Sequence, residues 1–207
     1  MGVITRKIGL ILGSARTNGN GAGLASWVSP IIQRRLNKAP LKERKPFEVV
    51  TVDPTAPPHP LGPLLDGSRF PAQVTDPEQY PSPAIREWSR FVTSCSALVI
   101  LTPEYNGAYP GELKNALDHL YYEWQRKPVL LITYGASGGG RCAKQLTEIL
   151  TGLKMQVVSD NLQISLPKEY IGGSERVVPG RTFDFLSAYE AAVEKAAGEL
   201  GELTSSS

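Results

Sequence analysis

The residues best placed to do chemistry follow the apolar run 97–101 and read Pro103-Glu104-Tyr105-Asn106-Gly107. A helical stretch comes next, so the order indicates a strand, a loop and a helix. In open parallel sheets, ligands bind at loops that follow the carboxyl ends of strands. The proline stops the strand and the glycine lets the backbone turn, which gives the loop a fixed shape. We expect this loop to hold a flat molecule by its edge.

A glycine-rich loop after the first apolar run carries groups that suit a phosphate. Ser14 offers a hydroxyl, Arg16 offers a charged fork, and the helix that follows adds positive potential at its N-terminus. A P-loop is excluded because Asn18 stands where its second glycine belongs and no lysine follows. A dinucleotide fingerprint starting at residue 19 is excluded because Leu24 occupies its third glycine position. The loop therefore predicts a phosphate monoester, with a plain glycine-rich turn as the alternative.

A third loop, residues 134–141, follows the fourth predicted strand and is also rich in glycine. Glycines allow a backbone to approach a ligand closely, although a flexible turn has the same composition. If the strands lie in the order 2-1-3-4-5, the loops after strands one and three flank the switch point of the sheet. The loop after strand four lies next to them, so all three loops would share one crevice.

Strand-length apolar runs alternate with stretches of helical periodicity, which is the pattern of βαβ units. The expected strands are residues 8–12, 47–52, 97–101, 128–134 and 156–158. The expected helices are residues 21–37, 83–94, 112–121, 139–150 and 183–200. The sequence therefore predicts the α/β class: a three-layer sandwich with a five-stranded parallel sheet in the order 2-1-3-4-5 and helices on both faces.

Length and composition favour one globular domain. A chain of 207 residues, 41% hydrophobic and 20% charged, is long enough for one buried core and short for two. We expect a single domain over residues 1–202 and a disordered tail over 203–207. The stretch 53–83 holds many of the 17 prolines, which cannot lie in a regular helix or a central strand. A stretch of this length is typical of a lid or an interface element.

Charge and cysteine content exclude several classes of protein. The 22 basic and 20 acidic residues leave a net charge of +2. We interpret the basic cluster 34–45 as a solvated helix end. No nucleic-acid partner is therefore expected. Cys95 and Cys142 are too few for a disulfide framework and lack metal-ligand spacing, which indicates a reducing compartment and no metal site. The apolar run 8–12 is too short for a signal peptide or a membrane span. We expect a cytoplasmic protein without a membrane contact.

Three motifs in chain order carry a resemblance to a known family. They are Gly13-Ser14-x-Arg16 with Gly21, then Thr102-Pro103-Glu104-Tyr105-Asn106-Gly107 with Tyr109-Pro110-Gly111-x-Leu113-Lys114-Asn115-Ala116-Leu117-Asp118, then Tyr134-Gly135 with Gly138-Gly139-x-Arg141. Over residues 8–166 the chain resembles the NADPH-dependent FMN reductase family of flavodoxin-like quinone, azo-dye and chromate reductases. The resemblance implies a flavodoxin-like fold, a bound FMN, NADPH or NADH as reductant, a small-molecule electron acceptor and a homodimer.

The resemblance also implies which residues hold the FMN. The phosphate would be held by Ser14, Arg16, Asn20 and Gly21. The isoalloxazine ring would lie along Pro103, Glu104, Tyr105 and Asn106, with its other edge closed by Ser137, Gly138 and Gly139. No side chain is expected to act as a nucleophile or base, because the cofactor carries the chemistry. A homodimer also agrees with the aromatic residues around one predicted helix, which are Tyr109, Tyr121, Tyr122 and Trp124.

Two other functions compete with a reductase. Residues 135–139 match the G-x-S-x-G elbow of hydrolases, in which Ser137 would be the nucleophile. That fold needs a histidine later in the chain, whereas His59 and His119 both precede the serine. The second alternative is an FMN-binding electron carrier or a redox-controlled partner-binding protein. Turnover of NADPH with a free quinone separates such a carrier from an enzyme.

Overall fold

A parallel sheet forms the centre of the protein, seen in a computed structural model that describes residues 5–38 and 45–206. Its strands follow the order β2-β1-β3-β4-β5, and β6 also pairs with β4. The strands are β1 (Arg6–Leu12), β2 (Phe47–Val52), β3 (Cys95–Pro103), β4 (Pro128–Gly135), β5 (Gln156–Val157) and β6 (Leu162–Ser165). The predicted class and strand order are therefore confirmed.

The last part of the sheet differs from the prediction of one strand at 156–158. The long strand β4 pairs with β5 near its start and with β6 near its end, both in parallel. The sheet is accordingly six-stranded, because two short strands share the edge that one was expected to cover. This arrangement brings the chain after β6 beside the loop after β4, where the Leu166 N–H donates to the Gly135 carbonyl at 2.9 Å.

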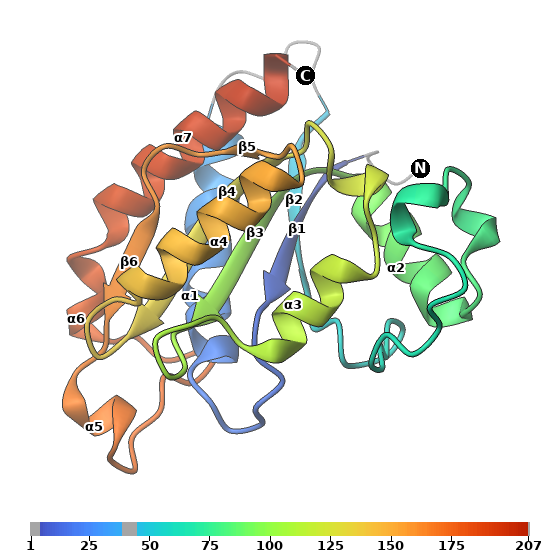
Figure 1. The fold of residues 1–207 in the computed structure, drawn as a ribbon. Coiled ribbons are helices and arrows are strands. Elements are labelled where there is room, and N and C mark those ends of the chain that lie inside the picture. Colours follow the sequence, from blue (N-terminus) through green and yellow to red (C-terminus); the bar gives the residue numbers. More distant parts are fainter. Residues whose placement is uncertain (1–4, 39–44, 207) are drawn as a thin grey trace.

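Helices cover both faces of the sheet (Figure 1). One face packs against α1 (Gly21–Leu36) and α7 (Glu190–Ser206), and the other against α2 (Pro83–Ser94), α3 (Gly111–Asp118) and α4 (Gly140–Gly152). Shorter helical segments are η1 (Pro71–Gln73), η2 (Pro77–Gln79), η3 (Tyr122–Trp124), α5 (Lys168–Ile171) and α6 (Asp184–Ser187). Helix α7 continues through residues 203–206, most of the segment expected to be a disordered tail, and Ser207 lies outside the described residues.

The central strands are buried on both of their faces. In β3, Val99 and Leu101 face the α1 and α7 layer, while Leu98 and Ile100 face the layer of α2, α3 and α4. Strand β4 alternates in the same way, with all four of its residues 129–132 fully buried. Side chains alternate along a strand, so a nearly continuous apolar run is what a doubly covered parallel sheet requires.

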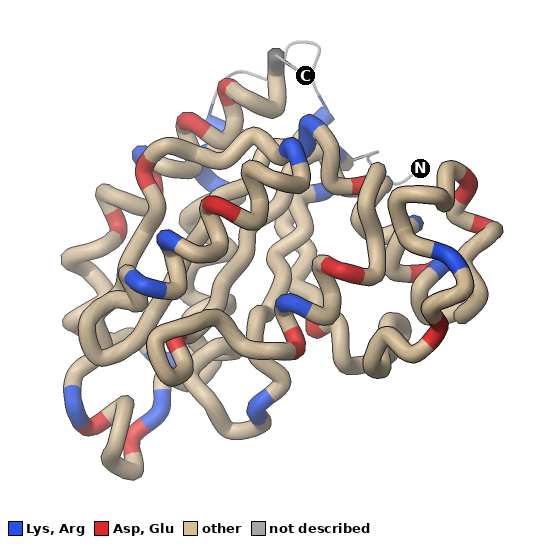
Figure 2. The backbone as a smooth tube through the Cα atoms, in the orientation of Figure 1, with Lys and Arg blue, Asp and Glu red and all other residues tan. Residues whose placement is uncertain are grey.

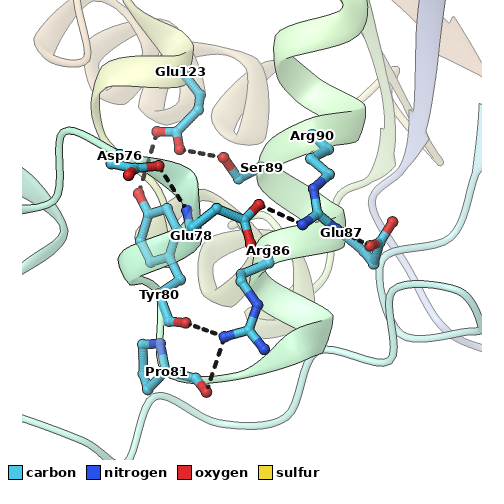
Figure 3. A network of polar contacts seen from close by, with 9 residues as sticks. All are labelled: Asp76, Glu78, Tyr80, Pro81, Arg86, Glu87, Ser89, Arg90 and Glu123. Atoms are coloured by element: carbon cyan, nitrogen blue, oxygen red, sulfur yellow. Dashed lines mark hydrogen bonds and ion pairs between the residues drawn. The ribbon is translucent and has the colours of Figure 1, made fainter.

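The proline-rich stretch is ordered and fastened to α2 by polar contacts (Figure 3). The Arg86 Nη1 donates to the carbonyl oxygens of Tyr80 at 2.6 Å and Pro81 at 3.4 Å. The Tyr80 hydroxyl donates to Glu123 at 3.3 Å, and Ser89 donates to the same carboxylate at 2.6 Å. Burial raises the pKa of the Tyr80 hydroxyl, and Glu123 adds to this, so the phenol stays a neutral donor. The stretch thus forms a fixed cover beside α2.

Charges of both signs are interspersed along the backbone (Figure 2). Of the basic cluster 34–45, residues 39–44 lie outside the described part of the chain, and Arg34 pairs with Glu194 of α7 at 3.2 Å. Over residues 5–38 and 45–206, no helix has the length and apolar character needed to cross a membrane.

Helix α1 packs backbone to backbone on the chain after β6. A Cβ built at Gly23 would lie 2.0 Å from the carbonyl oxygen of the buried Val177. Gly23→Ala should therefore lower the free energy of unfolding by about 1–3 kcal/mol, the cost of overpacking a close contact, as measured by urea denaturation. Gly152→Ala in α4 is the control, because its Cβ meets nothing within 4 Å. Equal stability of the two variants would contradict this account.

Candidate functional site

The loops after β1, β3 and β4 meet at the carboxyl edge of the sheet, at the lower end of the molecule in Figure 1. They line one cavity of about 490 Å³. Of the predicted site residues, this cavity contains Arg16, Asn20, Pro103, Glu104, Tyr105, Ser137 and Gly139. An adjoining hollow of about 340 Å³ contains Ser14, Arg16, Gly21 and Tyr105. Asn106 and Gly138 line neither space.

The second loop is a tight hairpin turn. The Tyr105 N–H donates to the Ala108 carbonyl at 2.8 Å, and the Ala108 N–H donates back at 3.0 Å. Asn106 and Gly107 lie between them with φ angles of 52° and 80°. Asn-Gly is the pair that such a turn favours, because both central residues need positive φ. Asn106 is exposed at the tip of this turn, and its predicted contact with a ring stays a prediction.

The Glu104 side chain ties the second loop to the third. Its Oε2 accepts the N–H groups of Arg141 at 3.0 Å and Cys142 at 3.2 Å, both in the first turn of α4. Amides of a first turn have no partner within their own helix, and the N-cap residue Gly139 has no side chain to supply one. A carboxylate is also favoured at the positive end of a helix. Glu104, predicted to line a ring, therefore caps α4 with its side chain.

Packing within the protein explains the glycines of the third loop. Gly138 and Gly139 have φ angles of 77° and 82°, a region that favours glycine. A Cβ at Gly138 would lie 2.9 Å from the Gln163 side chain, and one at Gly139 would lie 2.9 Å from that of Thr133. Beyond this loop, burial raises the pKa of Cys142 to about 12, with a smaller contribution from Glu104. The loop is therefore rigid and the thiol beside it stays protonated.

Tyr105 lies against the first loop. Its hydroxyl is 2.9 Å from the Ser14 Oγ, and the Arg16 guanidinium sits 3.9 Å from the centre of its ring. This stacking is a cation–π contact. Tyr105 was predicted at the isoalloxazine ring, but its side chain joins the two residues predicted at the phosphate. Tyr134, nearly fully buried, lies beside this group, and burial raises the pKa of its hydroxyl.

The Asn20 side chain is hydrogen-bonded to the carboxyl-terminal part of the chain. Its Nδ2 donates to the Tyr170 carbonyl at 2.9 Å, and its Oδ1 accepts the Val177 N–H at 2.9 Å. Asn20 is the N-cap residue of α1, yet its side chain makes no capping bond to the helix. Asn20 lines the cavity, as predicted for a phosphate contact, and its side chain also makes two structural bonds. The first amides of α1 are left without a side-chain cap, which is the arrangement that binds anions at helix N-termini.

The cavity also has walls that the sequence motifs did not reveal. They are Leu166, Tyr170, Ile171 and Arg176. All four come from the chain after β6, beyond the last motif in the sequence. The pairing of β6 with β4 carries this segment to the cavity, and the spacing of residues 166–176 contains no signal for it.

These residues fit a flat ligand that carries a phosphate monoester. The volume falls within the range of about 300–1,000 Å³ that is usual for ligand pockets. Arg16 and the uncapped start of α1 suit a phosphate at one end, and the aromatic Tyr105, Tyr134 and Tyr170 suit a planar group. The phosphate-binding interpretation of the first loop is therefore compatible with the geometry.

The same cavity does not fit a serine hydrolase. Ser137 is exposed, and the residues with positive φ are the two glycines that follow it. His119 is buried with its Nε2 2.9 Å from the Gly62 carbonyl, and His59 is buried against Trp88 and Phe91. Neither histidine lines the cavity that contains Ser137. The serine lacks the base that an elbow mechanism requires.

Known proteins are similar to this chain over most of its length. The profile of the family described as NADPH-dependent FMN reductase matches residues 6–167. The chain is 35% identical over 175 residues to an NAD(P)H-dependent FMN reductase of Saccharomyces cerevisiae, covering 84% of this chain and 87% of the relative. It is 37% identical over 168 residues to one of Schizosaccharomyces pombe, covering 81% and 77%. A quinone reductase of Escherichia coli is 33% identical over 116 residues, covering 53% and 57%.

Solved structures share the fold. A flavoenzyme NAD(P)H:(acceptor) oxidoreductase from Paracoccus denitrificans superposes with a TM-score of 0.68 at 17% identity, over 96% of this chain and 98% of its own. A flavodoxin from the domain Archaea superposes with a TM-score of 0.53 at 11% identity, over 96% and 99%. The flavodoxin-like fold is confirmed. Because the family profile and two relatives match most of its length, the chain belongs to the NADPH-dependent FMN reductase family.

Proposed function

We propose that this oxidoreductase holds FMN in the cavity at the carboxyl edge of the sheet and passes electrons from NAD(P)H to quinone-like or other small acceptors. The convergence of three loops on one cavity of about 490 Å³, with Arg16 at one end, supports this most directly. The relatives named FMN reductases and quinone reductases support the same activity. Cys95 and Cys142 are both free and buried, which agrees with a reducing, cytoplasmic location.

The first loop would bind the phosphate. A phosphate monoester carries close to two negative charges at neutral pH, and the Arg16 guanidinium and the start of α1 both favour such charge. Ser14 contributes a hydroxyl that already shares a hydrogen bond with Tyr105. Tyr105 would therefore lie between the phosphate end and the ring end of the cavity. Its stacking under Arg16 fixes the position of the cation before any ligand arrives.

The second and third loops would hold the ring. Residues 103–105 and 135–139 line the cavity on two sides, and the Glu104 cap on α4 fixes the distance between them. When bound, FMN supplies the redox chemistry, accepting electrons from NAD(P)H and giving two to an acceptor. The chain orients the ring and offers backbone donors near it. Ser137 is exposed and Cys142 stays protonated, so neither side chain is expected to act as a nucleophile.

The first prediction concerns the cofactor. The purified protein should be yellow and should release FMN and not FAD on denaturation, because the first loop suits a single phosphate. Arg16→Gln should raise the dissociation constant of FMN roughly tenfold, as expected for a partly exposed charge-assisted contact. Flavin fluorescence titration measures this. Arg34→Gln, at the far end of α1, is the matched control and should bind FMN like the wild type. A colourless protein that cannot be reconstituted with FMN would refute the proposal.

The second prediction concerns turnover. We expect one face of the bound flavin to be accessible, which admits NAD(P)H or the acceptor but not both, so steady-state rates should give parallel double-reciprocal lines. Ser137→Ala should keep most of the NADPH–quinone activity, because Ser137 only borders the cavity. Both activities are measured on one preparation, with an ester as the second substrate. Ester cleavage that depends on Ser137, without any NADPH oxidation in the presence of FMN and a quinone, is the contrary result.

A homodimer is the assembly that the surface favours. Of the aromatic residues predicted at an interface, Trp124 is instead fully buried, and its Nε1 donates to the Leu117 carbonyl at 3.0 Å. Tyr122 is 44% exposed and bonds to the proline-rich stretch. In that stretch Leu65 is 86% exposed and Phe70 is 69% exposed. Exposed apolar side chains gathered beside one cavity of about 600 Å³ are typical of an interaction surface.

The third prediction places the dimer interface there. Light scattering of the wild type at micromolar concentration should give twice the monomer mass of 22.4 kDa. The double variant Leu65→Glu, Phe70→Glu should shift the mass toward the monomer, because charges replace the apolar contact. Ala191→Glu on the exposed side of α7, across the sheet, should leave the mass unchanged. A monomeric wild type would rule the interface out.

A further inference from the structure

The Asn20 side chain fixes a distant segment against the first loop. Its two bonds reach Tyr170 and Val177, which lie 150 and 157 positions further along the chain. Both bonds reach backbone groups of the segment, so they set the position of its main chain. Residues 170–177 therefore have a defined position at the rim of the cavity.

Two further contacts anchor the same segment. Val177 is fully buried, and its carbonyl packs so closely on Gly23 of α1 that a side chain at that position would collide with it. The Tyr170 ring lies 5.8 Å from the ring of Phe183 and 5.1 Å from that of Phe185, and these aromatic residues pack on the core beneath α7. The segment is thus held at both of its ends. Arg176 lies between these ends, directly before the buried Val177.

Arg176 is the residue that this anchoring brings to the cavity. It precedes Val177 and lines the same space as Arg16, Thr17 and Asn18 of the first loop. Its Nη1 donates to the carbonyls of Gly173 at 2.7 Å and Glu175 at 2.5 Å, which holds the guanidinium over its own turn. An arginine has further N–H donors on Nε and Nη2. Within residues 5–38 and 45–206 these donors have no hydrogen-bond partner, so they are available to a ligand.

The charged residues of the cavity favour an anion near Arg16 and Arg176. Arg16 and Arg176 are its basic residues, and Glu104 is its acidic one. The Glu104 carboxylate is already bonded to the first amides of α4, at the third loop. Arg16 and Arg176 thus line one cavity, and Val177, next to Arg176, bonds to Asn20 at the N-cap of α1, whereas the single carboxylate is engaged at α4. This distribution matches a ligand with its negative charge concentrated at one end.

We propose that Arg176 is a specificity-determining residue that binds the FMN phosphate together with Arg16. This inference rests on the proposed function, in which the cavity binds FMN. The Asn20 side chain holds the segment that carries Arg176, and so brings a second arginine to the cavity that Arg16 lines. Two guanidinium groups balance the charge of a phosphate monoester. The chain should therefore discriminate strongly between FMN and riboflavin, which has the same ring but no phosphate.

The test compares the two flavins on the full-length chain after removal of bound flavin. Fluorescence titration gives the dissociation constants of FMN and riboflavin for the wild type, Arg176→Gln, Arg176→Lys and Arg181→Gln. Arg181 is the matched control, because it belongs to the same region, stacks 5.7 Å from the Phe183 ring and does not line the cavity. Thermal unfolding of each variant checks that the segment is still folded.

We expect Arg176→Gln to raise the dissociation constant of FMN roughly tenfold or more and to leave that of riboflavin within about twofold. Arg176→Lys should restore part of the preference for FMN, since it keeps the charge but loses the fork geometry. Arg181→Gln should behave like the wild type. If Arg176→Gln leaves FMN binding unchanged, or weakens the binding of both flavins equally, Arg176 does not bind the phosphate, while the proposed function stands. A change confined to the KM for NADPH also overturns the role of Arg176. A wild type that binds neither flavin refutes the proposed function itself.

Discussion

Burial of the central strands on both faces determines where this protein can do chemistry. Strands β3 and β4 have apolar side chains toward both helical layers, so no functional group can emerge from the body of the sheet. Apart from Ser96 at the start of β3, polar residues appear only at the carboxyl ends of these strands. Thr102 and Thr133 are fully buried there, the first against Gly13 and the second bonded to the Gly138 carbonyl at 2.8 Å. The same constraint that stabilises the core therefore positions the three loops of the site.

Side-chain contacts connect the three loops. Tyr105 connects the second loop to Ser14 and Arg16 of the first, and Glu104 connects it to the start of α4 and hence to the third. The loop proposed to bind the phosphate and the loops proposed to hold the ring are thus joined through two adjacent residues. Such a site is formed before a ligand arrives, which lowers the cost of ordering it on binding.

Local signals in the sequence predicted much of this structure, and non-local contacts account for what they missed. The bounds of β2 and α2 were predicted to the residue, because proline and polar breaks delimit them and their apolar patterns are clear. Strand β6 was missed because four residues show too little periodicity to indicate a pairing with β4. The two hydrogen bonds of the Asn20 side chain were not predicted because both of its partners lie more than a hundred positions away in the sequence. The motifs located the cavity, but they did not reveal the wall that the chain after β6 contributes.

We propose that FMN occupies the carboxyl edge of the sheet with its phosphate at the start of α1. A crystal structure of the chain with FMN tests this most directly. We predict phosphate density between Arg16 and the first turn of α1, and ring density between residues 103–105 and 135–139. Flavin density in the cavity beside His119 and the proline-rich stretch, with the carboxyl edge of the sheet empty, would contradict the account.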